Sequence, residues 1–100
     1  MSEPILDTEN PDTRVPRLAV GCRVRNVSSD EAMLLVPEGA LRLKGAASEI
    51  IGLIDGQRSI AAITIELQQK HAATDPSQIA AEVKQFLEKL HARSVILYND

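Results

Sequence analysis

The hydrophobic pattern changes its period midway along the chain, and this change decides the fold class. Pro37-Glu38-Gly39 predicts a tight turn, because proline fixes one backbone torsion and glycine tolerates a positive one. Residues 40–44 then alternate, with Leu41 and Leu43 inward and Arg42 outward, as in a half-covered strand. The apolar residues that follow recur with the spacing of a helix. The chain therefore predicts strands first and helices afterwards, which is an α+β fold.

Two more strands are predicted before this turn. Residues 22–27 alternate apolar and polar side chains, and residues 28–31 supply turn-forming ones. Residues 32–36 form a continuous apolar run that is too short for a helix and is typical of a central strand covered on both faces. Short turns make the three strands an antiparallel meander, with the first and third strands at its edges.

Three helical patterns follow the meander. The first ends at Asp55-Gly56, Ser59 can cap the second, and Asp75 with Pro76 can start the third. Residues 95–97 close the domain as a short apolar tail. This order predicts a winged helix-turn-helix-like domain, a three-stranded antiparallel sheet followed by three helices. The apolar stripes of the three helices are Ala47, Ile50, Ile51 and Ile54; Ile60, Ile63 and Leu67; and Ile79, Val83, Phe86, Leu87 and Leu90.

One folded domain accounts for the chain of 100 residues. Residues 1–16 contain three prolines and four acids against the single base Arg14, which predicts a disordered N-terminal arm. We expect the folded domain to span residues 17–97 and a C-terminal tail to span residues 98–100.

The composition argues against several kinds of partner. The chain has 14 acids and 11 bases, and only Phe86 and Tyr98 are aromatic. Neither an overall basic field nor a base-stacking surface is therefore predicted, and we expect no nucleic-acid partner. No apolar run approaches the length of a membrane span, and no signal peptide is recognised. Cys22 is alone, which is typical of a reducing compartment, so we expect a cytoplasmic protein without a membrane partner.

The sequence contains no recognisable catalytic constellation. His71 and His91 lie near predicted helix ends, where their charge interacts favourably with the helix dipole. Cys22 has no histidine close in sequence, and a partly buried cysteine is the ordinary interpretation. There is no Gly-rich phosphate loop, metal-ligand spacing or nucleophile elbow. We predict a protein that is not an enzyme and holds no cofactor.

The winged-helix architecture leaves a DNA-binding regulator as the main alternative. The exposed face of the third helix would then read DNA, but it offers two acids, and the two halves of the folded region are nearly neutral. A plain dimerisation module is a third possibility, and a homodimer could form by swapping of the arm or by pairing of strand edges. The residues of that helix face are Glu82, Gln85, Glu88 and Lys89, and the bases expected on the outer sheet face are Arg23, Arg25, Arg42 and Lys44.

The edge strand at residues 40–44 suggests a different function. Unpaired N–H and C=O groups at a sheet edge can accept a peptide as an additional strand. The third helix has an apolar seam from Ile79 to Leu90 that is wider than one contact with the sheet requires. Part of this seam can line a groove beside the strand, although ordinary core packing also explains it.

An ordered series of short motifs resembles the PqqD family, which acts in the synthesis of the redox cofactor pyrroloquinoline quinone (PQQ). The resemblance covers residues 16–97. No single motif is specific, but their order is. They are Pro16-Arg17-Leu18-Ala19, Arg23-Val24-Arg25, Leu34-Leu35-Val36-Pro37-Glu38-Gly39, Leu43, Ala47, Glu49-Ile50-Ile51, Leu53, Asp55-Gly56, Ser59-Ile60, Val83, Phe86-Leu87 and Leu90.

The resemblance implies a peptide chaperone. Members of the family are winged-helix peptide carriers that bind a ribosomally made precursor peptide and present it to a radical-SAM enzyme, which holds the iron–sulfur clusters and S-adenosylmethionine. In such modules the peptide adds beside the third strand and packs against the third helix. Carried over to this chain, the resemblance implies peptide contacts at Ala40, Leu41, Arg42, Leu43, Ile79, Val83 and Phe86.

The chain departs from the family pattern at the starts of two helices. Lys44 and Ala46 stand where the family usually has capping Asn and Thr residues, and Ala62 stands where a Glu often follows the second cap. We therefore expect a weaker start of the first helix and a looser strand–helix junction.

Overall fold

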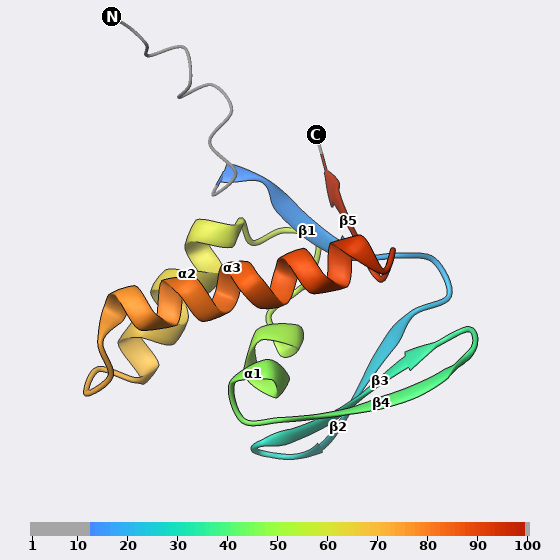
Figure 1. Cartoon of the computed structure of the whole chain (residues 1–100), viewed down its shortest axis with the longest axis horizontal. Coiled ribbons are helices and arrows are strands. Elements are labelled where there is room, and N and C mark those ends of the chain that lie inside the picture. The colour runs from blue at the N-terminus through green and yellow to red at the C-terminus, as the bar shows by residue number, and fades with distance from the viewer. Residues whose placement is uncertain (1–12, 100) are drawn as a thin grey trace, which may run out of the picture.

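The computed structural model describes residues 13–99 and places the three predicted strands in one antiparallel sheet (Figure 1). Its strands are β2 (Arg23–Ser28), β3 (Glu31–Val36) and β4 (Gly39–Lys44). They lie side by side in the order β2-β3-β4, so β3 is central and the other two are edges. The predicted meander and its two edges are confirmed.

The register of the sheet separates an inner face from an outer one. Leu34 lies opposite Leu41 and Ala32 opposite Leu43, which brings the apolar residues of β3 and β4 to the same face. Ala32 and Leu34 are buried, whereas Met33 between them is only half-buried. The prediction that this strand is covered on both faces is therefore wrong, because the helices pack against one face and leave the other open.

The open face of the sheet carries the expected cluster of bases. The register places Arg25 and Arg42 on either side of Met33. Arg42 also forms an ion pair with Glu31, with Nε 3.0 Å from a carboxylate oxygen. Because Arg42 points away from the helices, its side chain lies on the outer face of β4.

A second, two-stranded sheet joins the two ends of the domain. Strand β1 (Val15–Leu18) pairs antiparallel with β5 (Ile96–Asn99). Ordered structure therefore extends beyond the expected limits at residues 17 and 97, and the predicted apolar tail is a strand. The pairing links segments about 80 positions apart, so no local pattern could indicate it. The rest of the predicted arm, residues 1–12, lies outside the described residues.

Side chains reinforce this pairing. Nε of Arg17 donates to Oδ1 of Asn99 at 2.8 Å. The guanidinium of Arg14 lies 4.2 Å from the ring centre of Tyr98, within the range of a cation–π interaction. The carbonyl of Arg14 also accepts the backbone N–H of Ile60 at 2.9 Å, which ties the start of β1 to the start of the second helix.

Three helices follow the sheet, as predicted, namely α1 (Ala46–Gly52), α2 (Ile60–Lys70) and α3 (Pro76–Ala92). The hydroxyl oxygen of Ser59 caps α2 by accepting the N–H of Ala62 at 3.1 Å. Asp75 caps α3 by accepting the N–H of Ser77 at 3.0 Å, with proline next to the cap. Both caps match the sequence pattern.

The start of α1 is weaker, as the departures from the family pattern indicate. Gly45 occupies the N-cap position with φ 61° and ψ −132°, a conformation that favours glycine, and no side chain caps the helix. The hydroxyl of Ser48 donates instead to the carbonyl of Gly45 at 2.7 Å. This backbone conformation lets the chain pass from β4 into α1 within one residue.

The core lies between the inner face of the sheet and the three helices. Leu34 from β3, Ile63 from α2 and Val83 from α3 are fully buried, and α1 contacts both the sheet and α3. Ile65 falls off the apolar stripe of α2 and is 52% exposed. The buried apolar side chains are Ala32, Leu34, Ile50, Ile51, Ile54, Ile60, Ile63, Leu67, Ile79, Val83, Leu87, Leu90, Val95 and Ile96.

The two sides of β5 should differ sharply in their effect on stability. Ile96 is 0% exposed and its neighbour Leu97 is 37% exposed. We expect Ile96→Ala to lower the free energy of unfolding by about 2–5 kcal/mol, because it empties a core position. Leu97→Ala is the matched control and should change it by about 0.5 kcal/mol. Urea denaturation measures both, and equal losses would contradict the packing of β5 described above.

Candidate functional site

One side of β4 has no strand partner among residues 13–99, since its other side pairs with β3. Leu41 and Leu43 point to the inner face and are half-buried against the core, whereas Ala40 and Arg42 are exposed. The free edge therefore offers backbone donors and acceptors next to apolar side chains that are only partly covered.

A hollow of about 170 Å³ lies where β4 begins. Ala40 and Leu41 of β4 line it together with Arg93, which follows the last residue of α3, and Val95. The hollow brings the first half of the edge strand next to the end of α3. Its lining residues are Val36, Glu38, Gly39, Ala40, Leu41, Arg93 and Val95.

A second hollow, of about 180 Å³, lies beyond the other end of β4. It opens between the start of α1 and the middle of α3, and the half-buried Phe86 forms part of its wall. Since Arg93 lies at the first hollow and Phe86 at the second, α3 runs antiparallel to β4. Its lining residues are Ala46, Ala47, Ile50, Glu82, Gln85, Phe86 and Lys89. We call the free edge of β4 and the two hollows the groove.

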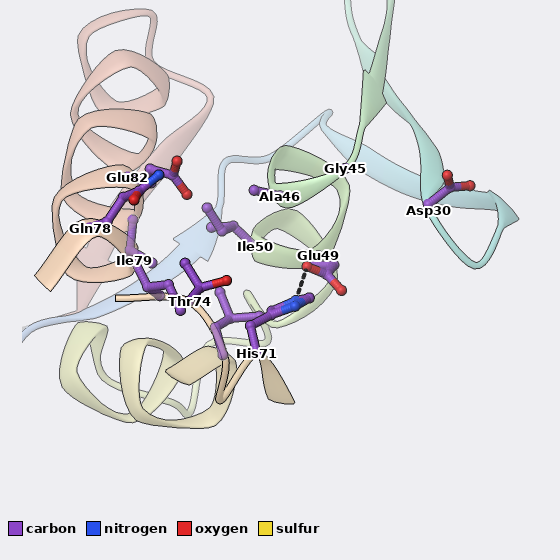
Figure 2. A pocket seen from close by; sticks show the side chains of 12 residues that line it. Asp30, Gly45, Ala46, Glu49, Ile50, His71, Thr74, Gln78, Ile79 and Glu82 are labelled. Atoms are coloured by element: carbon purple, nitrogen blue, oxygen red, sulfur yellow. Dashed lines mark hydrogen bonds and ion pairs between the residues drawn. The ribbon is translucent and has the colours of Figure 1, made fainter. Parts of the chain in front are cut away.

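A larger cavity of about 400 Å³ adjoins the groove (Figure 2). It lies between α1, the end of α2 and the start of α3, and it shares Ala46, Ile50 and Glu82 with the second hollow. Its lining residues are Asp30, Gly45, Ala46, Glu49, Ile50, Leu67, His71, Thr74, Gln78, Ile79, Glu82 and Val83. We call it the α1–α3 cavity.

Glu49 is fixed at the wall of this cavity by two neighbours from the end of α2. One carboxylate oxygen lies 2.7 Å from Nε2 of His71 and the other lies 2.9 Å from Nζ of Lys70. Burial by itself would raise the pKa of the Glu49 carboxyl, but hydrogen bonds from Lys70 and His71 and the charges of both outweigh it. The pKa is therefore lowered from its ordinary value of 4.5, so Glu49 is a carboxylate at neutral pH.

The residues that the resemblance implies do not all lie in the groove. Ala40 and Leu41 line the first hollow, and Phe86 lines the second. Ile79 and Val83 are almost fully buried and form part of the α1–α3 cavity rather than of the groove. Arg42 points to the outer face of the sheet, and Leu43 lies on the inner face between the two hollows.

Sequence reasoning missed several residues that line the groove. Lys89 and Arg93 follow Phe86 on the same side of α3, at spacings of three and four residues. That spacing was a usable signal. The sequence placed Lys89 on the exposed face of the third helix, but neither Lys89 nor Arg93 was assigned to peptide binding. Ala46 and Ala47, at the start of α1, carried no such signal, because their role depends on where the Gly45 junction directs the helix.

Cys22 and His91 lie outside the groove and the α1–α3 cavity. Cys22 is a free, half-buried thiol just before β2. His91 packs near the ring of Tyr98, with 4.9 Å between ring centres. In residues 13–99 no group of three or more His, Cys, Asp or Glu side chains could hold a metal ion. Within the same residues, no helix is both long and apolar enough to cross a membrane.

Comparison with known proteins identifies the family. The sequence matches the family described as Coenzyme PQQ synthesis protein D (PqqD) over residues 31–96. The chain belongs to the PqqD family. This match includes β3, β4 and all three helices, and therefore all residues that line the groove and almost all of the α1–α3 cavity.

Curated relatives extend the likeness over more of the chain. The "PqqA binding protein 1" of Pseudomonas putida is 38% identical over 85 residues, which cover 84% of this chain and 91% of the relative. The "PqqA binding protein" of Pseudomonas aeruginosa is 36% identical over 94 residues, which cover 93% of this chain and 94% of the relative.

Solved structures share the PqqD fold. The solution NMR structure of the PqqD truncation of Methylobacterium extorquens PqqCD, a stand-alone RiPP recognition element, matches with a TM-score of 0.67 and 31% identity. The match spans 83% of this chain and 88% of the chain in that structure. The structure of TbiB1 in complex with the TbiA(beta) leader peptide has a TM-score of 0.70, with coverage of 84% of this chain and 99% of that one. Its identity of 17% limits the likeness to the fold.

The contacts of Lys70 and His71 with Glu49 should make the stability of this PqqD protein sensitive to acid. Because the folded-state pKa of Glu49 is lowered, its contribution to stability is present above about pH 4.5 and is lost as the pH falls through that lowered value. We expect Glu49→Gln to cost about 1 kcal/mol at pH 7 and to lose less stability on acidification than the native protein. Urea denaturation at a series of pH values measures both effects.

Glu88→Gln is the control for this prediction, since Glu88 is an exposed acid of α3. It should shift neither the stability at pH 7 nor its slope with pH. An unchanged acid sensitivity in Glu49→Gln would show that the contacts with Lys70 and His71 do not stabilise the fold.

Proposed function

We propose that this protein binds a ribosomally made precursor peptide of PQQ synthesis by strand addition along the free edge of β4. The observation that carries the proposal is the groove, in which the unpaired backbone groups of β4 lie between two hollows. Residues of α3 line one hollow, and Arg93, which follows α3, lines the other. The names of the two curated relatives, which specify PqqA binding, support this substrate.

The peptide gains direction from β4 and affinity from the hollows. Each added backbone hydrogen bond contributes only about 0.5–1.5 kcal/mol net. Micromolar binding needs about 8 kcal/mol, more than four or five such bonds supply. Apolar contacts with Leu41, Leu43 and Phe86 provide the remainder, because these side chains are half-buried in the free protein and become covered by the peptide.

The bound peptide is then presented to the radical-SAM enzyme of the pathway, which does the chemistry. In this proposal the protein is a chaperone and not an enzyme. It supplies recognition alone, and the iron–sulfur clusters and S-adenosylmethionine belong to the partner enzyme. It works in the cytoplasm, where a precursor peptide leaves the ribosome.

The exposed face of α3 gives no support to the alternative function as a DNA-binding regulator. Glu82 and Glu88 are both exposed there and would repel phosphates. The basic cluster around Arg25 and Arg42 lies instead on the open face of a sheet, which is not the element that a winged helix inserts into the major groove.

Blocking the second hollow should weaken binding of the precursor peptide. Ala47 is half-buried on α1 and lines this hollow. We expect Ala47→Arg to weaken binding of the precursor peptide by about tenfold or more, because the long side chain occupies the space beside Phe86. Ala61→Arg is the matched control, since Ala61 is a half-buried residue of α2 that lines neither hollow. Titration calorimetry measures binding, and thermal melting confirms that both variants fold.

Mapping of amide shifts by NMR tests the location of the peptide directly. Addition of the precursor peptide should shift the amides of residues 40–43 and of Phe86. N-methylation of alternate peptide bonds should weaken binding only at the set of positions that pairs with β4. Shifts confined to α2, with residues 40–43 silent, would refute strand addition, and salt-sensitive binding to duplex DNA alone would favour the alternative function.

A further inference from the structure

The α1–α3 cavity differs from the two hollows in its charge. Each hollow combines an acid with a base, namely Glu38 with Arg93 and Glu82 with Lys89. The cavity instead has three acids and one histidine, and neither lysine nor arginine lines it among the described residues. Lys70, just outside the lining, compensates Glu49, but Glu82 and Asp30 form no salt bridge within the described residues. The remaining negative charge favours a cationic ligand group.

Two of the acids face the cavity from opposite sides. Glu82 comes from α3 and Glu49 from α1 (Figure 2). Lys70 and His71 already contact the carboxylate of Glu49, so this group is held in place and part of its charge is compensated. A carboxylate accepts up to about four hydrogen bonds, so Glu49 retains acceptor capacity. The salt bridges formed within residues 13–99 do not include Glu82.

The third acid, Asp30, lies at the rim of the cavity on the sheet side, and its carboxylate points outward (Figure 2). The carbonyl of Asp30 accepts the N–H of Gly45 at 2.9 Å, so the turn before β3 is fastened to the start of α1. The Asp30 carboxylate accepts a hydrogen bond from Ser28 and forms no salt bridge within the described residues.

The floor of the cavity is apolar. Ile50, Ile79 and Val83 are buried side chains that line it, together with Leu67. An apolar floor under acidic walls matches a lysine or arginine side chain, whose aliphatic stem covers apolar surface while its charged head reaches the carboxylates. A small inorganic cation would leave this floor uncovered.

The cavity continues directly from the groove. It shares Ala46, Ile50 and Glu82 with the second hollow, and Gly45, which also lines it, follows the last residue of β4. A peptide paired along β4 therefore passes the mouth of the cavity as it leaves the strand beyond Lys44.

From this arrangement we infer that the α1–α3 cavity receives a basic side chain of the precursor peptide, from the segment that flanks the added strand at its Lys44 end. The inference rests on the proposed function and specifies it further. Glu82 and Glu49, with Asp30 at the rim, make the cavity a specificity site, and its occupation fixes the register of the peptide on β4.

The test is a double-mutant cycle with the precursor peptide of PQQ synthesis as the probe. Each lysine and arginine of the peptide is replaced singly by norleucine, and the protein variants are Glu82→Gln and Glu82→Gln combined with Asp30→Asn. We expect Glu82→Gln to weaken binding about two- to fivefold at low ionic strength, since a partly exposed ion pair contributes this much. One norleucine substitution should weaken binding to the native protein and have little further effect on the double variant.

Glu88→Gln is the matched control on α3, and it should bind every peptide as the native protein does. NMR gives a second readout, since the native peptide should shift the amides of Gly45 and Glu82 in addition to residues 40–43. A shortened peptide that lacks the basic segment flanking the added strand should still shift the amides of residues 40–43 but not those of Gly45 and Glu82.

Two results would overturn the inference, and they are distinguishable. If residues 40–43 shift but the double variant binds with native affinity, the peptide occupies the groove and the cavity plays no part. If residues 40–43 do not shift at all, the proposed function fails and this inference fails with it.

Discussion

The passage from β4 into α1 at Gly45 is the constraint on which the rest of the structure depends. The N–H of Gly45 donates to Asp30, and its carbonyl accepts bonds from the hydroxyl and N–H of Ser48 and from the N–H of Glu49. The positive φ of 61° turns the chain out of the strand at once, so that α1 contacts the sheet on one side and α3 on the other. Because α1 occupies this position, the free edge of β4 stays open between the two hollows instead of closing against α3.

Much of the fold could be predicted from the sequence because its signals are local. Alternation located β2 and β4, a short apolar run between turns located β3, and Ser59 and Asp75 marked the starts of two helices. The pairing of β1 with β5 could not be predicted, because neither four-residue segment carries a periodic signal and their partners are far apart in the sequence. The continuous apolar run of β3 wrongly predicted a strand covered on both faces, since alternate side chains of β3 lie on the face that the helices leave open.

The candidate site was predictable in outline and not in detail. Chain order identified β4 as an edge strand, and the family resemblance directed attention to α3. The resemblance implies contacts at Ile79, Val83 and Phe86, and of these three Phe86 lines the groove whereas the other two line the α1–α3 cavity. Periodicity could not separate them, because it cannot say which part of an apolar seam is core. The contacts of Glu49 with Lys70 and His71 could not be predicted from the sequence. They form only because the end of α2 packs beside α1, and these residues are more than 20 positions apart in the chain. Tertiary packing, rather than any motif, creates the α1–α3 cavity.

The antiparallel pairing of β1 with β5 has a consequence for architecture. Val15 lies opposite Asn99, so the polypeptide enters and leaves the domain at neighbouring points, and neither β1 nor residues 96–99 line the groove. A unit built in this way can be spliced into a longer polypeptide, or appended to one, without disturbing its recognition surface.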